Sequence, residues 1–150
     1  MVYFSLMFIS TITIAQQKQK TILFVCEHGS AKSVVAAAHF ERMAKEQGLN
    51  VQVLSRGTNP DKVIPPKINE YLRQDGFGTY SGSPEKLTSN DLKNADYVVA
   101  LCSLPDSVLM NDKVKTWNIP SFEAGYPVAR DSILNNIKRT IKEIKSEDLK

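Results

Sequence analysis

The sequence predicts an α/β domain with a mostly parallel sheet, and three observations support that fold class. Short apolar runs alternate along the chain with segments of helical periodicity, a pattern typical of strands connected through helices. The length of 150 residues is enough for one domain with a real core. No internal repeat and no domain linker interrupts the pattern, so we expect a single domain from residue 21 to residue 150.

The first half of the domain contains two predicted strands, each followed by a helix. Residues 21–25 form an apolar run typical of a buried strand. Residues 32–47 place apolar side chains near helical spacing and end before a glycine. A second strand is predicted at 51–55 and a second helix at 64–74, with two prolines in its first turn, where a missing N–H does no harm.

The second half repeats the alternation with shorter elements. A short helix is predicted at 88–94, and residues 96–102 form the most apolar run after the N-terminal segment, as expected for a central strand. A short helical segment at 104–110 and a fourth, shorter strand at 113–117 follow. The chain ends in an amphipathic helix at 128–145, with isoleucine and leucine on one face.

Composition and charge exclude several classes of protein. The net charge is +3, and no long basic run or basic-aromatic stripe is present, so we expect no nucleic-acid partner. The two cysteines, Cys26 and Cys102, lie far apart in sequence and fit neither zinc spacing nor a dense disulfide scaffold. We therefore expect neither a metal nor a bound cofactor.

The amino terminus differs from the rest of the chain. Residues 2–15 are uncharged and mostly apolar, and a polar stretch follows to residue 20. The apolar run is too short for a comfortable membrane span and resembles the core of a signal peptide with a polar spacer. We expect export, to the periplasm or outside the cell. If this segment is an ordinary N-terminal extension, the protein is cytoplasmic.

The loop between the first strand and the first helix has the composition of an oxyanion site. Its backbone N–H groups have no helical partner, and together with the helix dipole they favour an anion of phosphate size. Lys32 adds a positive charge, and Gly29 permits a backbone conformation that a Cβ would hinder. The loop spacing is not that of a nucleotide-binding P-loop. We expect the oxyanion to be bound by Glu27, His28, Gly29, Ser30 and Ala31.

Cys26 stands at the start of this loop, where a thiol ionises more readily than usual. The hydroxyl groups of Ser30 and Ser33 can donate to the thiolate or to a bound oxyanion. We therefore predict Cys26 as a nucleophile, with Ser33 as a hydrogen-bond donor to its sulfur. The alternative is a small buried residue with no chemical role.

Five segments of the chain carry a family resemblance. In sequence order they are ILFVCEHGSAKS (22–33), SRGT (55–58), DGF (75–77), LTSNDLKNADYVVAL (87–101) and WNIP (117–120). Together they resemble the low-molecular-weight protein tyrosine phosphatase superfamily, which includes the thioredoxin-coupled arsenate reductases. The resemblance implies a three-layer fold, with a four-stranded parallel sheet flanked by helices, and identifies the chain as an atypical member. It also implies a small oxyanion or phosphomonoester as substrate.

Two positions depart from the family pattern. Lys32 stands where the family has an arginine, so one point charge replaces a planar fork that binds two oxygens. Ser121 stands where the family has an aspartate general acid, and loss of such an acid typically costs roughly 100- to 10,000-fold in rate. Glu123 is a candidate to replace that acid, and its alternative role is a solvated loop carboxylate.

Cys102 resembles the second cysteine of the arsenate reductases, which attacks the arsenic adduct of the nucleophile. Those enzymes use a further cysteine afterwards, and this chain has none, so an external thiol would have to finish the reaction. The sequence therefore predicts a cysteine-dependent phosphatase or arsenate reductase. Two alternatives stay open: a catalytically weak or inactive phosphatase-like protein that binds oxyanions or phosphopeptides, and a redox-sensing or structural disulfide protein.

Overall fold

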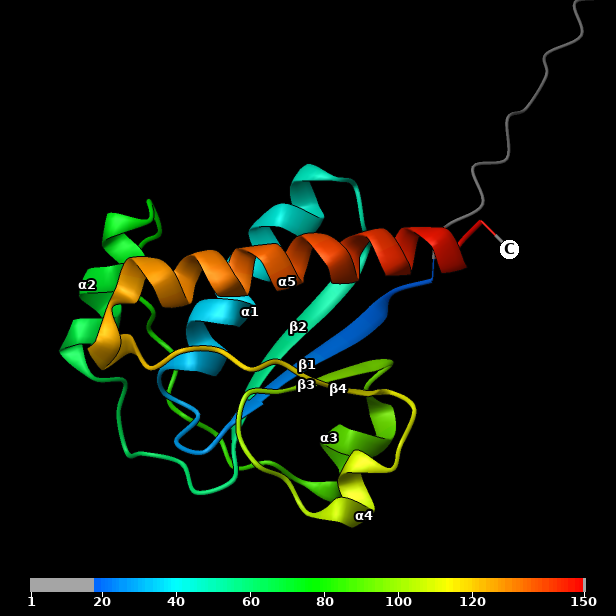
Figure 1. The fold of residues 1–150 in the computed structure, drawn as a ribbon, viewed down its shortest axis with the longest axis horizontal. Coiled ribbons are helices and arrows are strands. Elements are labelled where there is room, and N and C mark those ends of the chain that lie inside the picture. Colours follow the sequence, from blue (N-terminus) through cyan, green and yellow to red (C-terminus); the bar gives the residue numbers. More distant parts are fainter. Residues whose placement is uncertain (1–17, 150) are drawn as a thin grey trace, which may run out of the picture.

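The computed structural model describes residues 18–149, which form a sheet with helices on both faces (Figure 1). The predicted signal segment at 2–15 lies outside the described residues. The sheet is four-stranded and parallel, with the order β2-β1-β3-β4. The strands are β1 (Lys20–Cys26), β2 (Val51–Gly57), β3 (Tyr97–Ala100) and β4 (Val114–Thr116).

The helices form a layer on each face of the sheet, as Figure 1 shows. One layer contains α1 (Lys32–Glu46), α2 (Pro66–Gln74) and α5 (Tyr126–Glu147), and the other contains α3 (Ser89–Asn94) and α4 (Asp106–Leu109). A single 3₁₀ turn, η1 (Phe122–Ala124), precedes α5. Within the described residues, no helix combines the length and apolar character needed to cross a bilayer.

Alternating side chains of β1 enter two separate cores. Ile22 and Phe24 pack with α1, α2 and α5, whereas Leu23 and Val25 pack toward α3 and α4. All four side chains are fully buried, which explains why this strand is a continuous apolar run rather than an alternating one. The two cores confirm the three-layer α/β fold with its parallel sheet.

The differences from the predicted boundaries have local causes. Helix α2 begins at Pro66 rather than at 64, because Pro65 precedes a proline and its backbone is extended, with ψ 137°. Helix α5 begins two residues earlier than predicted, at Tyr126, since Pro127 is tolerated in a first turn. Strand β3 ends at Ala100, two residues early, and the turn η1 was not predicted.

Candidate active site

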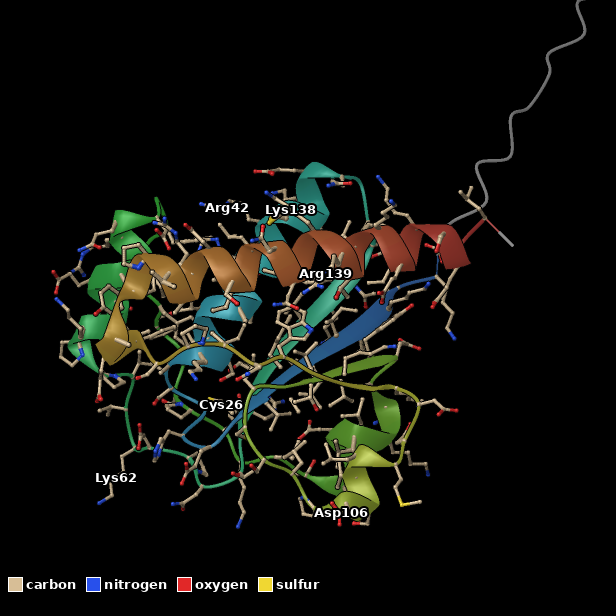
Figure 2. All side chains as sticks on the ribbon, in the orientation of Figure 1. Cys26, Arg42, Lys62, Asp106, Lys138 and Arg139 are labelled. Atoms are coloured by element: carbon tan, nitrogen blue, oxygen red, sulfur yellow. The ribbon has the colours of Figure 1, made fainter. Side chains whose placement is uncertain are left out.

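Cys26 is the last residue of β1 and lies at the carboxyl edge of the sheet. Figure 2 shows it there, apart from the basic side chains Arg42, Lys138 and Arg139 of the helical layer. The residue is 6 % exposed. Ligands of open α/β sheets bind at this edge, so the structure places the predicted nucleophile where a ligand is expected.

Three polar groups order the surroundings of the Cys26 sulfur. Ser33 Oγ lies 3.0 Å from Sγ, and the N–H of Gly29 donates to the same sulfur over 3.2 Å. Ser55, on β2, donates its hydroxyl to Ser33 Oγ over 2.8 Å, which leaves the Ser33 proton free to point at the sulfur. Hydrogen bonds to a charged form favour that form, so the arrangement suits a thiolate. The contact of Ser55 could not be foreseen before the pairing of β1 with β2 was known.

The amino terminus of α1 is open to a ligand. Ala31, at the N-cap, has no side-chain oxygen, and no side-chain cap is present there in the described part of the chain. The first turn contains no acidic residue and begins with Lys32, a cation at the end of the helix where the dipole disfavours it. Such an end becomes favourable once an anion accepts the free N–H groups.

Lys32 lines two clefts beside the loop. Its ammonium group donates to the carbonyl of Ile119 over 2.7 Å, which connects α1 to the segment between β4 and η1. One cleft, of about 500 Å³, extends past Cys102 and Trp117, and the other, of about 370 Å³, extends toward Tyr71. The bond to Ile119 uses one of the three N–H donors of the Lys32 ammonium, so two donors remain for an anion in the loop.

The smaller cleft brings Glu123 to the same space as the loop. Its walls include the rings of Tyr71 and Phe122, and His28 and Glu123 also line it. Ser121 accepts a hydrogen bond from the N–H of Glu123 over 3.2 Å and so caps η1. Ser121, expected at the position of the family's acid, therefore has a structural contact, and the exposed carboxylate of Glu123 lies two residues later.

Cys102 follows β3 at the same carboxyl edge of the sheet as Cys26, but it packs against the core of α3 and α4, whereas Cys26 belongs to the core of α1, α2 and α5. Val25 is opposite Ala100 in the register, and the N–H of Leu101 donates to the Val25 carbonyl over 2.7 Å. Both thiols are free. Burial, and secondarily the nearby charge of a Cys26 thiolate, raise the pKa of Cys102, which favours the protonated form of this thiol. Glu27 and Cys102 also share a hollow of about 350 Å³.

Residues 57–61 lie alongside the loop and extend the pairing of β1 and β2. The N–H groups of Thr58, Asn59 and Asp61 donate to the carbonyls of residues 26, 27 and 28 over 3.1, 2.8 and 3.0 Å. Gly29 has φ +59° and approaches Gly57 so closely that a Cβ on either residue would lie 2.7 Å from backbone nitrogen. Backbone contact alone therefore sets much of the loop's shape, and glycine is required at both positions.

Asp61 also contacts two side chains of the loop. Its Oδ2 accepts the hydroxyl of Ser30 over 2.5 Å, and its Oδ1 lies 3.4 Å from His28 Nδ1. The Ser30 hydroxyl therefore faces Asp61 rather than the Cys26 sulfur. The sequence did not predict a role for Asp61, because an aspartate before a lysine in a loop is usually solvated.

A buried polar cluster supports the wall of the smaller cleft. The Asp75 carboxylate, 5 % exposed, accepts hydrogen bonds from His39 over 2.9 Å, from Arg130 over 3.2 Å and from the Tyr126 hydroxyl. Tyr126 stacks on Tyr71 with ring centroids 3.9 Å apart. The Asp75 carboxylate thus connects α1, the end of α2 and the start of α5 directly beneath the cleft.

The charges of this cluster are assigned by its hydrogen bonds. Burial alone would raise the pKa of Asp75, but the bonds from Tyr126, His39 and Arg130 outweigh burial and lower that pKa. Burial lowers the pKa of His39 more than the bond to Asp75 raises it. Arg42 lies 3.3 Å from His39 Nδ1, so His39 is neutral, with its proton on Nε2. His39 is buried and has a structural role in this cluster.

The described residues contain no group of three or more His, Cys, Asp or Glu side chains placed to hold a metal ion. The polar groups around Cys26 are instead N–H and hydroxyl donors, one ammonium group and a second thiol. Such donors bind anions rather than cations. The geometry therefore suits a tetrahedral oxyanion facing a thiolate.

Comparison with known proteins agrees with this geometry. The family model for low molecular weight phosphotyrosine protein phosphatase matches residues 21–118. An arsenate reductase of Staphylococcus aureus (strain bovine RF122 / ET3-1) is 29 % identical over 133 residues, which cover 85 % of this chain and 98 % of that protein. The family match includes the Cys26 loop and Cys102 and ends before Glu123.

Solved structures show the same fold. A low molecular weight protein tyrosine phosphatase from Bacillus subtilis superposes with a TM-score of 0.72 at 23 % identity, over 85 % of this chain and 99 % of that chain. A thioredoxin-dependent arsenate reductase from Corynebacterium glutamicum superposes with a TM-score of 0.67 at 25 % identity, over 85 % of this chain and 62 % of that chain.

Proposed function

The chain belongs to the low molecular weight phosphotyrosine protein phosphatase family, and we propose that it reduces arsenate, with Cys26 as nucleophile and Cys102 as resolving thiol. One observation carries the choice within the family: a second free thiol, Cys102, lies at the same carboxyl edge of the sheet as the nucleophile, although the two side chains pack against different cores. A phosphate ester hydrolase has no need of that thiol. The similarity to arsenate reductases of S. aureus supports the same choice.

The reaction begins when the Cys26 thiolate attacks arsenic and one arsenate hydroxyl takes a proton from solvent and leaves as water. Cys102 then attacks the Cys26 sulfur, a disulfide forms, and the sulfur–arsenic bond breaks. Arsenic takes the bonding electron pair and leaves as arsenite, and the Cys102 proton is released. An external thiol reduces the disulfide, because the chain contains no third cysteine.

The loop supplies the electrostatic part of this mechanism. The N–H groups at the start of α1 and the Lys32 ammonium hold the oxyanion against the sulfur, while Ser33 and Gly29 stabilise the thiolate before attack. In the reduction the departing arsenate oxygen must be protonated to leave as water, whereas the later step, in which Cys102 displaces arsenic from Cys26, expels no oxygen. Ser121 in place of the family aspartate therefore affects the first step of the reduction and not the second.

Phosphomonoester hydrolysis is the second candidate, and the aromatic cleft favours it. Tyr71 and Phe122 line a space beside Lys32 that would accept the leaving group of an ester, and Glu123 on the same cleft could protonate it. Cys26 would then form a thiophosphate that water hydrolyses. Cys102 would be a bystander in this reaction.

Two assays on the purified protein separate the candidates. We expect arsenate to form a Cys26–Cys102 disulfide in the absence of added thiol, detected by non-reducing peptide mapping, and arsenite to accumulate when glutathione or a thioredoxin system is supplied. Cys26→Ser should abolish both this reaction and any hydrolysis of p-nitrophenyl phosphate, while Cys102→Ser should abolish only the first. Tight arsenate or phosphate binding with neither activity would overturn the proposal in favour of a binding protein.

Export stays a prediction, and it affects the reductant. An oxidising compartment would favour the Cys26–Cys102 disulfide over the free thiols. The mass of the amino-terminal peptide of protein isolated from its native host would show whether residues before position 21 are removed.

A further inference from the structure

Asp61 stands outside the loop that contains Cys26, and yet it contacts that loop at two residues. Its backbone N–H donates to the carbonyl of His28 over 3.0 Å, and its carboxylate accepts the hydroxyl of Ser30 over 2.5 Å. Gly29 lies between these two contacts, and its N–H donates to the Cys26 sulfur over 3.2 Å. Asp61 therefore fixes the residues on both sides of the group that contacts the nucleophile.

The contact with Ser30 is unusual in its burial. Ser30 is 1 % exposed, and a buried hydroxyl needs a partner. In the structure that partner is a carboxylate oxygen at a short distance, as expected for a charge-assisted bond. The second carboxylate oxygen faces His28 Nδ1 at 3.4 Å.

The sign of the Asp61 charge is wrong for direct help in anion binding. A carboxylate beside an oxyanion loop repels the ligand. His28 Nδ1 lies 3.4 Å from Asp61 Oδ1, and this imidazole offsets the charge only when it is protonated. The presence of Asp61 therefore has to be explained by geometry. We propose that Asp61 is a positioning residue that holds the tip of the Cys26 loop in its anion-binding form, acting through Ser30 and Gly29.

This inference rests on the proposed function of the loop and goes beyond it, because it concerns a residue on a different segment. Two substitutions separate the two effects of the Asp61 side chain, which are positioning of the loop and negative charge. Asp61→Asn keeps an oxygen acceptor for Ser30 and removes the negative charge, whereas Asp61→Ala removes both. Positioning and charge thus predict opposite outcomes for the alanine variant.

The first test measures inorganic phosphate binding by titration calorimetry in the full chain. We expect Asp61→Ala to weaken phosphate binding at least tenfold, and Asp61→Asn to bind as well as the wild type or better. Asp112→Asn, an exposed loop carboxylate between α4 and β4, is the matched control and should change nothing. Equal binding by Asp61→Ala and the wild type, or tighter binding by both Asp61 variants, would overturn the inference.

The second test asks whether Asp61 acts through Ser30. If it does, Ser30→Ala and the double variant Ser30→Ala/Asp61→Ala should lose about as much phosphate affinity as Asp61→Ala alone, because coupled residues are not additive. Full additivity of the two losses would refute the route through Ser30. Thermal unfolding of each variant checks that affinity is compared between folded proteins.

The third test distinguishes failure of this inference from failure of the proposed function. Alkylation of Cys26 by iodoacetamide, located by peptide mapping, does not require an anion. We expect several-fold slower alkylation in Asp61→Ala and a normal rate in Asp61→Asn. If the wild type binds neither phosphate nor arsenate, the proposed function fails, and this alkylation rate still decides the role of Asp61: an unchanged rate in the alanine variant overturns it.

Discussion

Replacing Ser33 by alanine removes the hydroxyl that lies 3.0 Å from the Cys26 sulfur. A hydrogen bond to a charged group contributes about 1.5–3 kcal/mol, which corresponds to a loss of roughly 10- to 150-fold in a rate that depends on the thiolate. Because a less stabilised thiolate is also more nucleophilic, with a Brønsted coefficient of about 0.5, alkylation at neutral pH should slow by only ~3- to 12-fold. Attack of the same thiolate on arsenate should be offset in the same way and slow by a similar factor.

Ser55→Ala is the matched comparison for this prediction. It keeps the Ser33 hydroxyl and removes the donor that orients it over 2.8 Å, so a neutral hydrogen bond worth about 0.5–1.5 kcal/mol is lost. The decrease in rate should be roughly 2- to 12-fold. Stopped-flow measurement of single-turnover disulfide formation with arsenate, and of alkylation by iodoacetamide, gives both rates. A Ser33→Ala protein that is folded and reacts at the wild-type rate in both assays would refute the assigned role of Ser33.

Three further predictions follow from contacts of the site and of the buried cluster. Cys102→Ser should stop arsenite formation while leaving alkylation of Cys26 within about twofold, as quantified by arsenite release and peptide mapping. Lys32→Arg should tighten phosphate binding about three- to tenfold in calorimetry, because a planar fork can contact two oxygens of the anion where the ammonium offers a point charge; weaker binding would show that arginine does not fit. Folding lowers the pKa of His39 and that of Asp75, so the unfolded chain binds more protons than the folded one. The free energy of unfolding should therefore fall as the pH drops below 6.5, because of His39, and again below 3.8, because of Asp75. Urea unfolding across pH tests this, and His39→Gln, which keeps a donor to Asp75, should flatten the dependence near pH 6; an unaltered slope would contradict the neutral assignment of His39.

The fold could be predicted because its signals are local and strong. The apolar run at β1 and the helical period of α1 each follow from residues adjacent in sequence, and both elements lie within two residues of their predicted bounds. The strand order β2-β1-β3-β4 depends instead on which apolar faces meet. The turn η1 depends on a side-chain cap from Ser121, which has no periodicity to detect.

The site could be predicted in part for the same reason. Cys26, Lys32 and Ser33 lie within one loop of eight residues, 26–33, so their chemistry could be inferred from proximity in sequence. Ser55 and Asp61 reach the loop from the end of β2, and only the parallel pairing of the strands brings them there. The predicted roles of Cys102 and Glu123 depend on reactivity, and they stay predictions until the assays above are done.

The uncapped start of α1 has a thermodynamic consequence that needs no knowledge of the substrate. Because the N–H groups at this end of the helix have no side-chain cap, any anion that fits them stabilises the native state. The gain in stability is set only by the concentration of the anion and its affinity. At a concentration 100 times its dissociation constant, an anion adds about 2.7 kcal/mol, a rise in melting temperature on the order of 5–10 °C for a chain of this size. The melting curve of the protein in the presence of arsenate, phosphate, sulfate and aryl phosphates would therefore rank its natural ligands before any activity is known.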